Sequence, residues 1–235
     1  MAKRKQNKLF FFIIFWVILI VSFIFSAFLI ILKAQGWQLN YKTWKIVHTG
    51  MIILNGDPSN AQVTLNGRII SQHLPTQIRN LSPGNYQVVI SRPDYWDWQR
   101  TINVSQSKAE TLNNIILFLK NPQDAEADKS LTVDKLIQQS ANFSQDLRIQ
   151  KNEIYFQGNL ITRFSQNVLT ASLYPDNQHI VFQINNEVRV IEIDGSNNTL
   201  LFNLNSTEPT FFSYVNDGKQ IYYLDQGQIK TKVIR

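Results

Sequence analysis

The chain has 235 residues, room for one or two small domains, and a formal charge of +6. It contains no cysteine, which excludes a disulfide scaffold, a thiolate metal site and a cysteine nucleophile. Five basic residues at the N-terminal end account for most of the excess charge: Lys3, Arg4, Lys5, Lys8 and Lys33. Residues 34–235 hold the other 18 basic residues and all 17 acidic ones, so they carry only +1. This balance argues against a nucleic-acid-binding domain, which needs a basic face on its folded part.

Residues 9–32 form a run of 24 residues without a charge. As a helix the run is roughly 36 Å long, enough to cross a hydrocarbon core of about 30 Å. It is longer than the apolar region of a signal peptide, and no small-x-small cleavage pattern follows it. We therefore predict an uncleaved transmembrane helix over residues 9–32, preceded by a basic tail over residues 1–8.

Four positive charges precede this span and Lys33 follows it directly, which predicts a cytoplasmic N-terminus and an extracytoplasmic remainder. Residues 33–49 form a juxtamembrane segment that contains Trp37, Tyr41 and Trp44. Aromatic residues beside a span often lie at the level of the lipid headgroups. Packing of these side chains onto the first domain is an equally good interpretation.

Residues 50–120 show short alternating apolar patterns separated by turn signals, with no helical period. Asn66-Gly67 supplies the positive φ that a two-residue hairpin turn needs. Pro83-Gly84 is a second turn signal. This pattern predicts a small antiparallel β-sandwich.

The order of turns and aromatic residues in this segment resembles the PEGA domain, a family named after the tetrapeptide Pro-Glu-Gly-Ala. The matching positions are Pro58, Ser59, Asn60, Ala61, Asn66, Gly67, Pro83, Gly84, Tyr86, Tyr95 and Trp98. The family is a β-sandwich module of bacterial cell-surface and membrane-anchored proteins and is not known as a catalytic unit. The resemblance therefore implies a spacer or binding domain, without naming a ligand.

Two departures from the family pattern carry structural expectations. Asn60 replaces a glycine, and because asparagine tolerates a left-handed backbone we expect the turn to be kept. Asp94 stands where the family often has glycine, which predicts another strained turn. The resemblance also assigns Tyr95 and Trp98 to the sandwich core.

Residues 121–140 are polar and acidic and are predicted to form a linker at a domain boundary. Thr132 is a candidate cap for a short helix that ends near Gln139, and this alternative stays open.

Residues 141–235 are β-patterned and contain a repeat with a period of 41 residues. The first copy contains Ser172, Asp176, Asn177, Ile180, Glu187, Val188 and Arg189, and the second contains Ser213, Asp217, Gly218, Ile221, Gln228, Ile229 and Lys230. A period of roughly 40–45 residues is typical of propeller blades. The units resemble TolB-type or WD-type blades, and residues 154–156 are expected to belong to an earlier, degenerate blade.

The repeat ends part-way through a unit, because Arg235 falls where Asp194 stands in the preceding copy. The segment holds only two to three blades, whereas a closed propeller needs about four. Either the reading frame is short, or the strands pack as a small open sheet against another surface. The short frame is the simpler interpretation, and an unclosed edge would invite pairing with a partner strand.

The sequence contains few patterns typical of catalysis. His48, His73 and His179 have no metal-ligand spacing. A phosphate-binding loop and a nucleophile elbow are both missing. Asp94 and Asp97 are expected in a hydrated turn. We predict no catalytic residue, no metal site and no cofactor.

Residues 95–98 form the most suggestive patch, since aromatic faces beside carboxylates are typical of sugar-binding surfaces. Tyr95 and Trp98 are assigned to the core by the resemblance. Trp96 is then the candidate exposed aromatic, with Asp94 and Asp97 as candidate ligand-binding neighbours. Core packing remains the favoured interpretation of the patch.

These observations predict a mainly β, bacterial, single-pass membrane protein. The predicted function is a non-catalytic surface interaction or structural module, with the lipid bilayer as partner through residues 9–32. The alternative is a protein that binds an envelope polysaccharide, with an envelope glycan or another envelope protein as partner. A hydrolase with a site on a longer propeller is the least favoured interpretation.

Overall fold

The computed structural model describes residues 2–40, 44–128, 130–143 and 145–235, with side chains from residue 12 onward except 39 and 40. The chain divides into two compact units. The first comprises Met1–Ile53, Gln77–Tyr86 and Ile102–Thr111, and the second comprises Leu54–Thr76, Gln87–Thr101 and Leu112–Arg235. Tyr41, a predicted juxtamembrane aromatic, lies outside the described residues.

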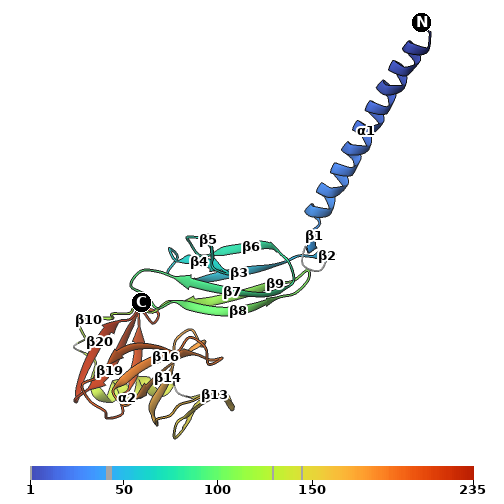
Figure 1. The fold of residues 1–235 in the computed structure, drawn as a ribbon. Coiled ribbons are helices and arrows are strands. Elements are labelled where there is room, and N and C mark those ends of the chain that lie inside the picture. Colours follow the sequence, from blue (N-terminus) through green and yellow to red (C-terminus); the bar gives the residue numbers. More distant parts are fainter. Residues whose placement is uncertain (1, 41–43, 129, 144) are drawn as a thin grey trace. The chain divides into compact units, whose positions relative to one another are not determined.

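The N-terminal helix α1 spans Ala2–Ala34 (Figure 1). The most apolar 18 residues of its segment Phe12–Ala34 have a mean hydropathy of 3.0 and are not buried against the protein. The predicted apolar helix is therefore confirmed. It begins before residue 9 because the Lys, Arg and Gln residues of the tail are good helix formers. By length and composition α1 is suited to be a membrane span or a signal sequence.

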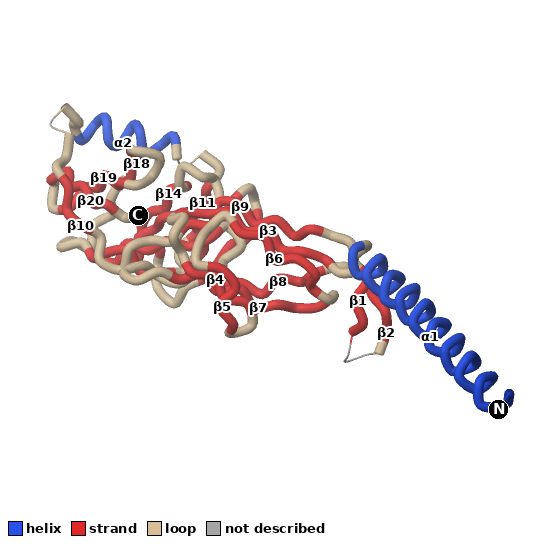
Figure 2. Tube along the Cα trace, turned by 90° about the horizontal axis from the view of Figure 1, so that it is seen from above, coloured by secondary structure: helices blue, strands red, loops and turns tan. Residues whose placement is uncertain are grey.

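A two-stranded antiparallel hairpin follows α1, formed by β1 (Trp37–Asn40) and β2 (Lys45–His48). Figure 2 shows this hairpin beside the C-terminal end of α1. Gly36, with a φ of 82°, makes the reversal after the helix. The Gly36 carbonyl then accepts hydrogen bonds from the backbone N–H and the hydroxyl of Thr49, at 2.8 and 3.1 Å. These bonds tie the base of the hairpin to the end of α1.

Two sheets then follow, the number that a β-sandwich requires. The first sheet has the strand order β6 (Thr76–Leu81), β3 (Gly50–Asp57), β9 (Ala109–Ile116). The second has the order β5 (Arg68–Ser71), β4 (Gln62–Leu65), β7 (Gly84–Ser91), β8 (Trp98–Val104). Burial alternates along β3 and β8, so each strand turns one face to a core.

The predicted turns are largely as expected. Asn66 and Gly67 have φ angles of 47° and 79°, which confirms the two-residue hairpin turn, and Asp94 has a φ of 70°, as predicted. The expected turn is kept at Ser59 and Asn60, but Asn60 is not among the residues with positive φ, so a left-handed backbone at Asn60 does not form it. That loop is instead held by the Ser59 carbonyl, which accepts a hydrogen bond of 2.7 Å from the Leu74 N–H.

Residues 121–140 differ from the predicted solvated linker. β10 (Gln123–Ala125) pairs antiparallel with the last strand of the chain, and helix α2 (Val133–Asn142) follows. The Thr132 hydroxyl accepts from the Lys135 N–H at the N-terminus of α2, which confirms the capped-helix alternative. Leu136 and Ser140 are buried, so the segment is part of the folded C-terminal region.

Three antiparallel sheets make up the rest of the chain. The first contains β11 (Leu147–Gln150), β12 (Glu153–Phe156) and β13 (Asn159–Arg163). The second contains β14 (Val168–Leu173), β15 (His179–Ile184), β16 (Glu187–Glu192) and β17 (Thr199–Asn203). The third has the order β10, β20 (Gln228–Val233), β19 (Gln220–Asp225), β18 (Phe212–Val215).

The repeat is visible as strand pairs. β15 and β16 recur as β19 and β20, with bounds displaced by 41 residues and the same antiparallel pairing. The fourth strand of the third sheet is β10, in the position that β17 holds in the second sheet. The edge of β20, predicted to be open, is therefore paired with β10.

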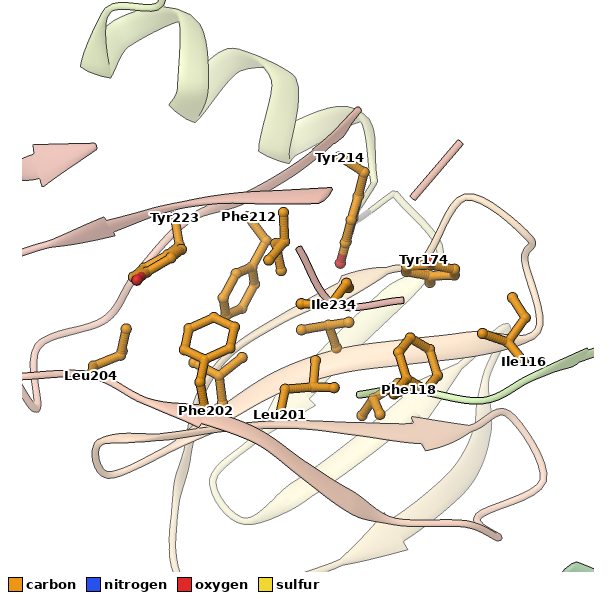
Figure 3. Close-up of a cluster of buried hydrophobic side chains, with 14 residues drawn as sticks. Ile116, Phe118, Tyr174, Leu201, Phe202, Leu204, Phe212, Tyr214, Tyr223 and Ile234 are labelled. Carbon is orange, nitrogen blue, oxygen red and sulfur yellow. The ribbon is translucent and has the colours of Figure 1, made fainter. Parts of the chain in front are cut away.

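Two apolar clusters hold these sheets together. One lies between the C-terminal sheets β14–β17 and β18–β20 with β10, and it includes Phe202, Phe212 and Tyr223 (Figure 3). The other, with Ile154, Ile180 and Phe182 among its members, joins the first and second sheets. Every residue of β15 is buried because its two faces supply different clusters.

Candidate functional site

The predicted aromatic patch lies within the second unit, where the end of the sandwich contacts the second C-terminal sheet. Trp98 is buried, and its indole N–H donates a hydrogen bond to the Glu192 carboxylate. The resemblance placed Trp98 in the sandwich core. Its burial fits that expectation, but its polar atom belongs to a contact between domains.

A polar network surrounds this contact, which we call the joint and define by Trp98, Arg100, Glu192, Asp194 and Asn197. The Arg100 guanidinium forms ion pairs with the carboxylates of Glu192 and Asp194. The Asn197 amide donates to Glu192 at 2.8 Å and accepts from the Gln99 N–H at 3.0 Å. Glu192 is only 8% exposed, so a buried carboxylate joins the two domains.

The electrostatics of the joint favour the ionised form of Asp194. Burial alone would raise the pKa of Asp194, but hydrogen bonds from Ser196 and the nearby Arg100 charge lower it below its ordinary value. Asp194 therefore stays charged at neutral pH.

Trp96 is half-buried rather than open to solvent. Its indole N–H donates to the Leu200 carbonyl at 2.8 Å, and its ring packs against the cluster between the second and third sheets. Asp94 and Asp97 are exposed. The three residues therefore do not form an open stacking platform, and a glycan site on them stays a prediction.

A second polar site, which we call the Asp225 pocket, lies beside β20 and β19. It has a volume of about 460 Å³, within the usual range for small-molecule sites. Its charged and polar lining includes Asp124, Asn203, Tyr223, Asp225, Lys230 and Lys232. Two carboxylates and two ammonium groups make the pocket neutral overall and rich in hydrogen-bonding groups.

Asp225 is the structural centre of this pocket. Its side chain is 2% exposed and accepts hydrogen bonds from Lys230 Nζ at 2.8 Å and from the Asn205 side-chain amide at 2.9 Å. Burial acts to raise the pKa of Asp225, but the hydrogen bonds from Lys230 and Asn205 outweigh it and lower the pKa. A second ion pair, between Lys232 and the exposed Asp124, is 2.6 Å long.

The sequence pattern did not predict a site role for either Asp225 or Glu192. In the 41-residue repeat Asp225 stands where the first copy has Ile184, and a charge at an apolar position of a repeat is a usable signal. Glu192 had no such signal, because its partner Arg100 is 92 residues away. Among the described residues, no group of three His, Cys, Asp or Glu side chains could hold a metal ion.

Comparison with known proteins assigns a family to part of the chain. The family model of the PEGA domain matches residues 49–118. That match agrees with the resemblance seen in the sequence, and it covers less than half of the chain. No curated protein sequence matches the chain.

Two solved structures show weak likeness to the chain. One is a protein of unknown function from Bacteroides fragilis, described as putatively membrane-associated, which is 10% identical and has a TM-score of 0.26. The match covers 79% of the present chain and 95% of the Bacteroides fragilis chain. An auxiliary nutrient binding protein from Bacteroides thetaiotaomicron is 8% identical, with coverages of 79% and 70% and a TM-score of 0.19. Likeness at these TM-scores carries no argument about fold or function.

Proposed function

We propose that this chain is a single-pass, membrane-anchored extracytoplasmic protein of a bacterium. In this proposal α1 is an uncleaved signal-anchor, and the PEGA domain with the C-terminal sheets is a non-catalytic interaction or structural module. The C-terminal sheets act as propeller-like blades that display their turns. The observation that carries the proposal is an apolar helix with no protein cover, followed by a PEGA domain that is tied to further sheets by a buried polar joint.

The orientation is tested by thiol labelling, since the natural chain has no cysteine. We expect a Gln228→Cys variant to react with a membrane-impermeant maleimide in spheroplasts, because Gln228 is exposed on β20. A Gln6→Cys variant should react only after lysis. The opposite labelling pattern would reverse the orientation, and an intact mass that lacks residues 1–33 would show cleavage instead of anchoring.

A second candidate function is the binding of an envelope polysaccharide in the Asp225 pocket. The specific observation is a neutral pocket with carboxylate, ammonium, amide and phenol groups, the donors and acceptors that a polyhydroxyl ligand needs. The Lys232–Asp124 and Lys230–Asp225 pairs hold these groups in place.

Retention on purified cell wall tests this candidate. An Asn203→Arg variant should fill the pocket and lower retention at least several-fold, while Asn113→Arg, at an exposed position of β9, should leave it unchanged. Asp97→Ala separates the two candidate sites, because it removes a carboxylate of the aromatic patch. Loss of retention only in Asp97→Ala would move the site to that patch, and equal retention in all variants would remove both sites.

A further inference from the structure

The hairpin of β1 and β2 has features that a water-exposed element does not explain. It is a two-stranded sheet with no third strand among the described residues. Isolated two-stranded hairpins are at best marginally stable in water and need packing against another surface. Among the described residues, the contacts of the hairpin include the bonds from Thr49 to Gly36 at its base and the Trp37–His48 ring contact at 3.7 Å between its two strands.

Two large apolar side chains of the hairpin are left uncovered. Trp44 is 77% exposed and Ile46 is 61% exposed. Trp44 is therefore not packed against the rest of the first unit. Single exposed apolar residues are common on protein surfaces, so what sets Ile46 apart is its place beside the end of α1.

The apolar surface of the hairpin continues that of the helix. Ile46 and Trp37 line a cleft of about 370 Å³ together with Leu29 and Leu32 from the last turns of α1. Leu29 is 49% exposed on a helix whose apolar face has no protein cover. A medium that covers the end of α1 therefore also reaches Ile46.

The charges nearby favour a lipid headgroup region as that medium. Lys33, Lys42 and Lys45 lie between residues 33 and 56, and this stretch contains no acidic residue. Basic side chains near a membrane surface are attracted to anionic lipids by about 1 kcal/mol each. Tryptophan is the residue most suited to this depth, since its ring is apolar and its N–H is polar.

We propose that the β1–β2 hairpin lies in the lipid interface and buries Trp44 and Ile46 there, as a second membrane contact beside α1. This inference rests on the proposed anchoring by α1. Because the Thr49–Gly36 bonds hold the hairpin to the helix end, the hairpin fixes how the chain leaves the bilayer. The lipid-facing element of the protein then extends to residue 46.

Depth measurements with single nitroxide labels test the inference on the full chain, again using the absence of cysteine. Labels replace Val21 in the span, Ile46 in the hairpin, and Ile69 in β5, whose exposure of 59% matches that of Ile46. The protein is reconstituted in phosphatidylcholine vesicles with and without phosphatidylglycerol. Collision of each label with oxygen, which concentrates in lipid, is compared with collision with a water-soluble nickel chelate.

We expect the ratio of oxygen collisions to nickel collisions to be highest for the label at residue 21. The ratio at residue 46 should be several-fold above the ratio at residue 69. It should also rise at residue 46 when phosphatidylglycerol is present. A deep label at 21 with water-like labels at both 46 and 69 would overturn the hairpin inference and leave the anchor intact. A water-like label at 21 would overturn the anchor itself. Exclusion of both reagents from residue 46 would show a protein contact, such as a second copy, and would also overturn the inference.

Discussion

Replacing Glu192 by alanine is expected to lower the free energy of unfolding by about 3 kcal/mol. The carboxylate is buried and accepts from Trp98, Arg100 and Asn197. Its removal takes the acceptor from the Trp98 indole N–H and one partner each from Arg100, which keeps Asp194, and Asn197, which keeps Ser196. Removal of one partner of a buried charged pair is costly because the other charge stays in a poorly solvated place. The value lies at the lower end of the usual range, since Arg100 is 32% exposed and water can reach it.

Urea unfolding of the full chain in detergent, followed by tryptophan fluorescence, measures this change. Trp98 is a reporter inside the joint, so its signal should also follow local opening. The matched control is Glu187→Ala, which removes an exposed carboxylate that pairs with Arg189 at 2.8 Å. That variant should lose less than about 1 kcal/mol, as exposed ion pairs do.

Glu192→Gln separates hydrogen bonding from charge. The amide oxygen can still accept from Trp98, while the ion pair with Arg100 is lost, so we expect about half of the alanine effect. Equal losses in Glu192→Ala and Glu187→Ala would mean that the joint does not contribute to stability. The two domains would then be connected only by the chain and by apolar packing.

Local patterns predicted the elements whose cause is local. The apolar helix follows from an uncharged run, and the Asn66-Gly67 turn follows from two residues that accept positive φ. The 41-residue repeat also matches the strands of the structure, because each copy forms its hairpin from residues that are close in the sequence. In these places the sequence pattern and the stabilising contact lie within a few residues of each other.

Strands that form by pairing with distant residues could not be predicted from local patterns. Gln123-Asp124-Ala125 has no alternating apolar pattern, and it becomes a strand because its backbone pairs with residues 231–233. Thr132 carried a capping signal, so the helix beside it was an open alternative. The polar run as a whole still resembled a linker, since its composition does not show that Leu136 is buried.

Trp96 illustrates a related gap. The sequence shows this aromatic residue between Asp94 and Asp97. Whether its ring is exposed depends on which surface a later segment of the chain covers. The Leu200 carbonyl, 104 residues further along the chain, accepts its N–H. A candidate stacking residue is therefore a packing residue of the second unit, and the pocket with the better polar lining lies elsewhere, around Asp225.

Replacing Asp225 by asparagine is expected to lower the free energy of unfolding by about 2 kcal/mol at neutral pH. The change removes the charge that accepts from Lys230 and Asn205 in a nearly buried position. Hydrogen bonds to charged groups contribute more than neutral ones, and Lys230 loses its counter-charge while it is 33% exposed. Asp146→Asn, at an exposed position, is the control and should change little.

The pH dependence gives this prediction its specific test. The pKa of Asp225 is lowered in the folded protein relative to an unfolded value of about 3.9. A lowered pKa means that the stabilisation is fully present above the unfolded pKa and is lost as pH falls through the folded pKa. The difference between the natural chain and Asp225→Asn should therefore be constant from about pH 6 to pH 8 and shrink below about pH 4. A difference that stays constant down to pH 2 would show that the carboxylate charge of Asp225 does not stabilise the third sheet.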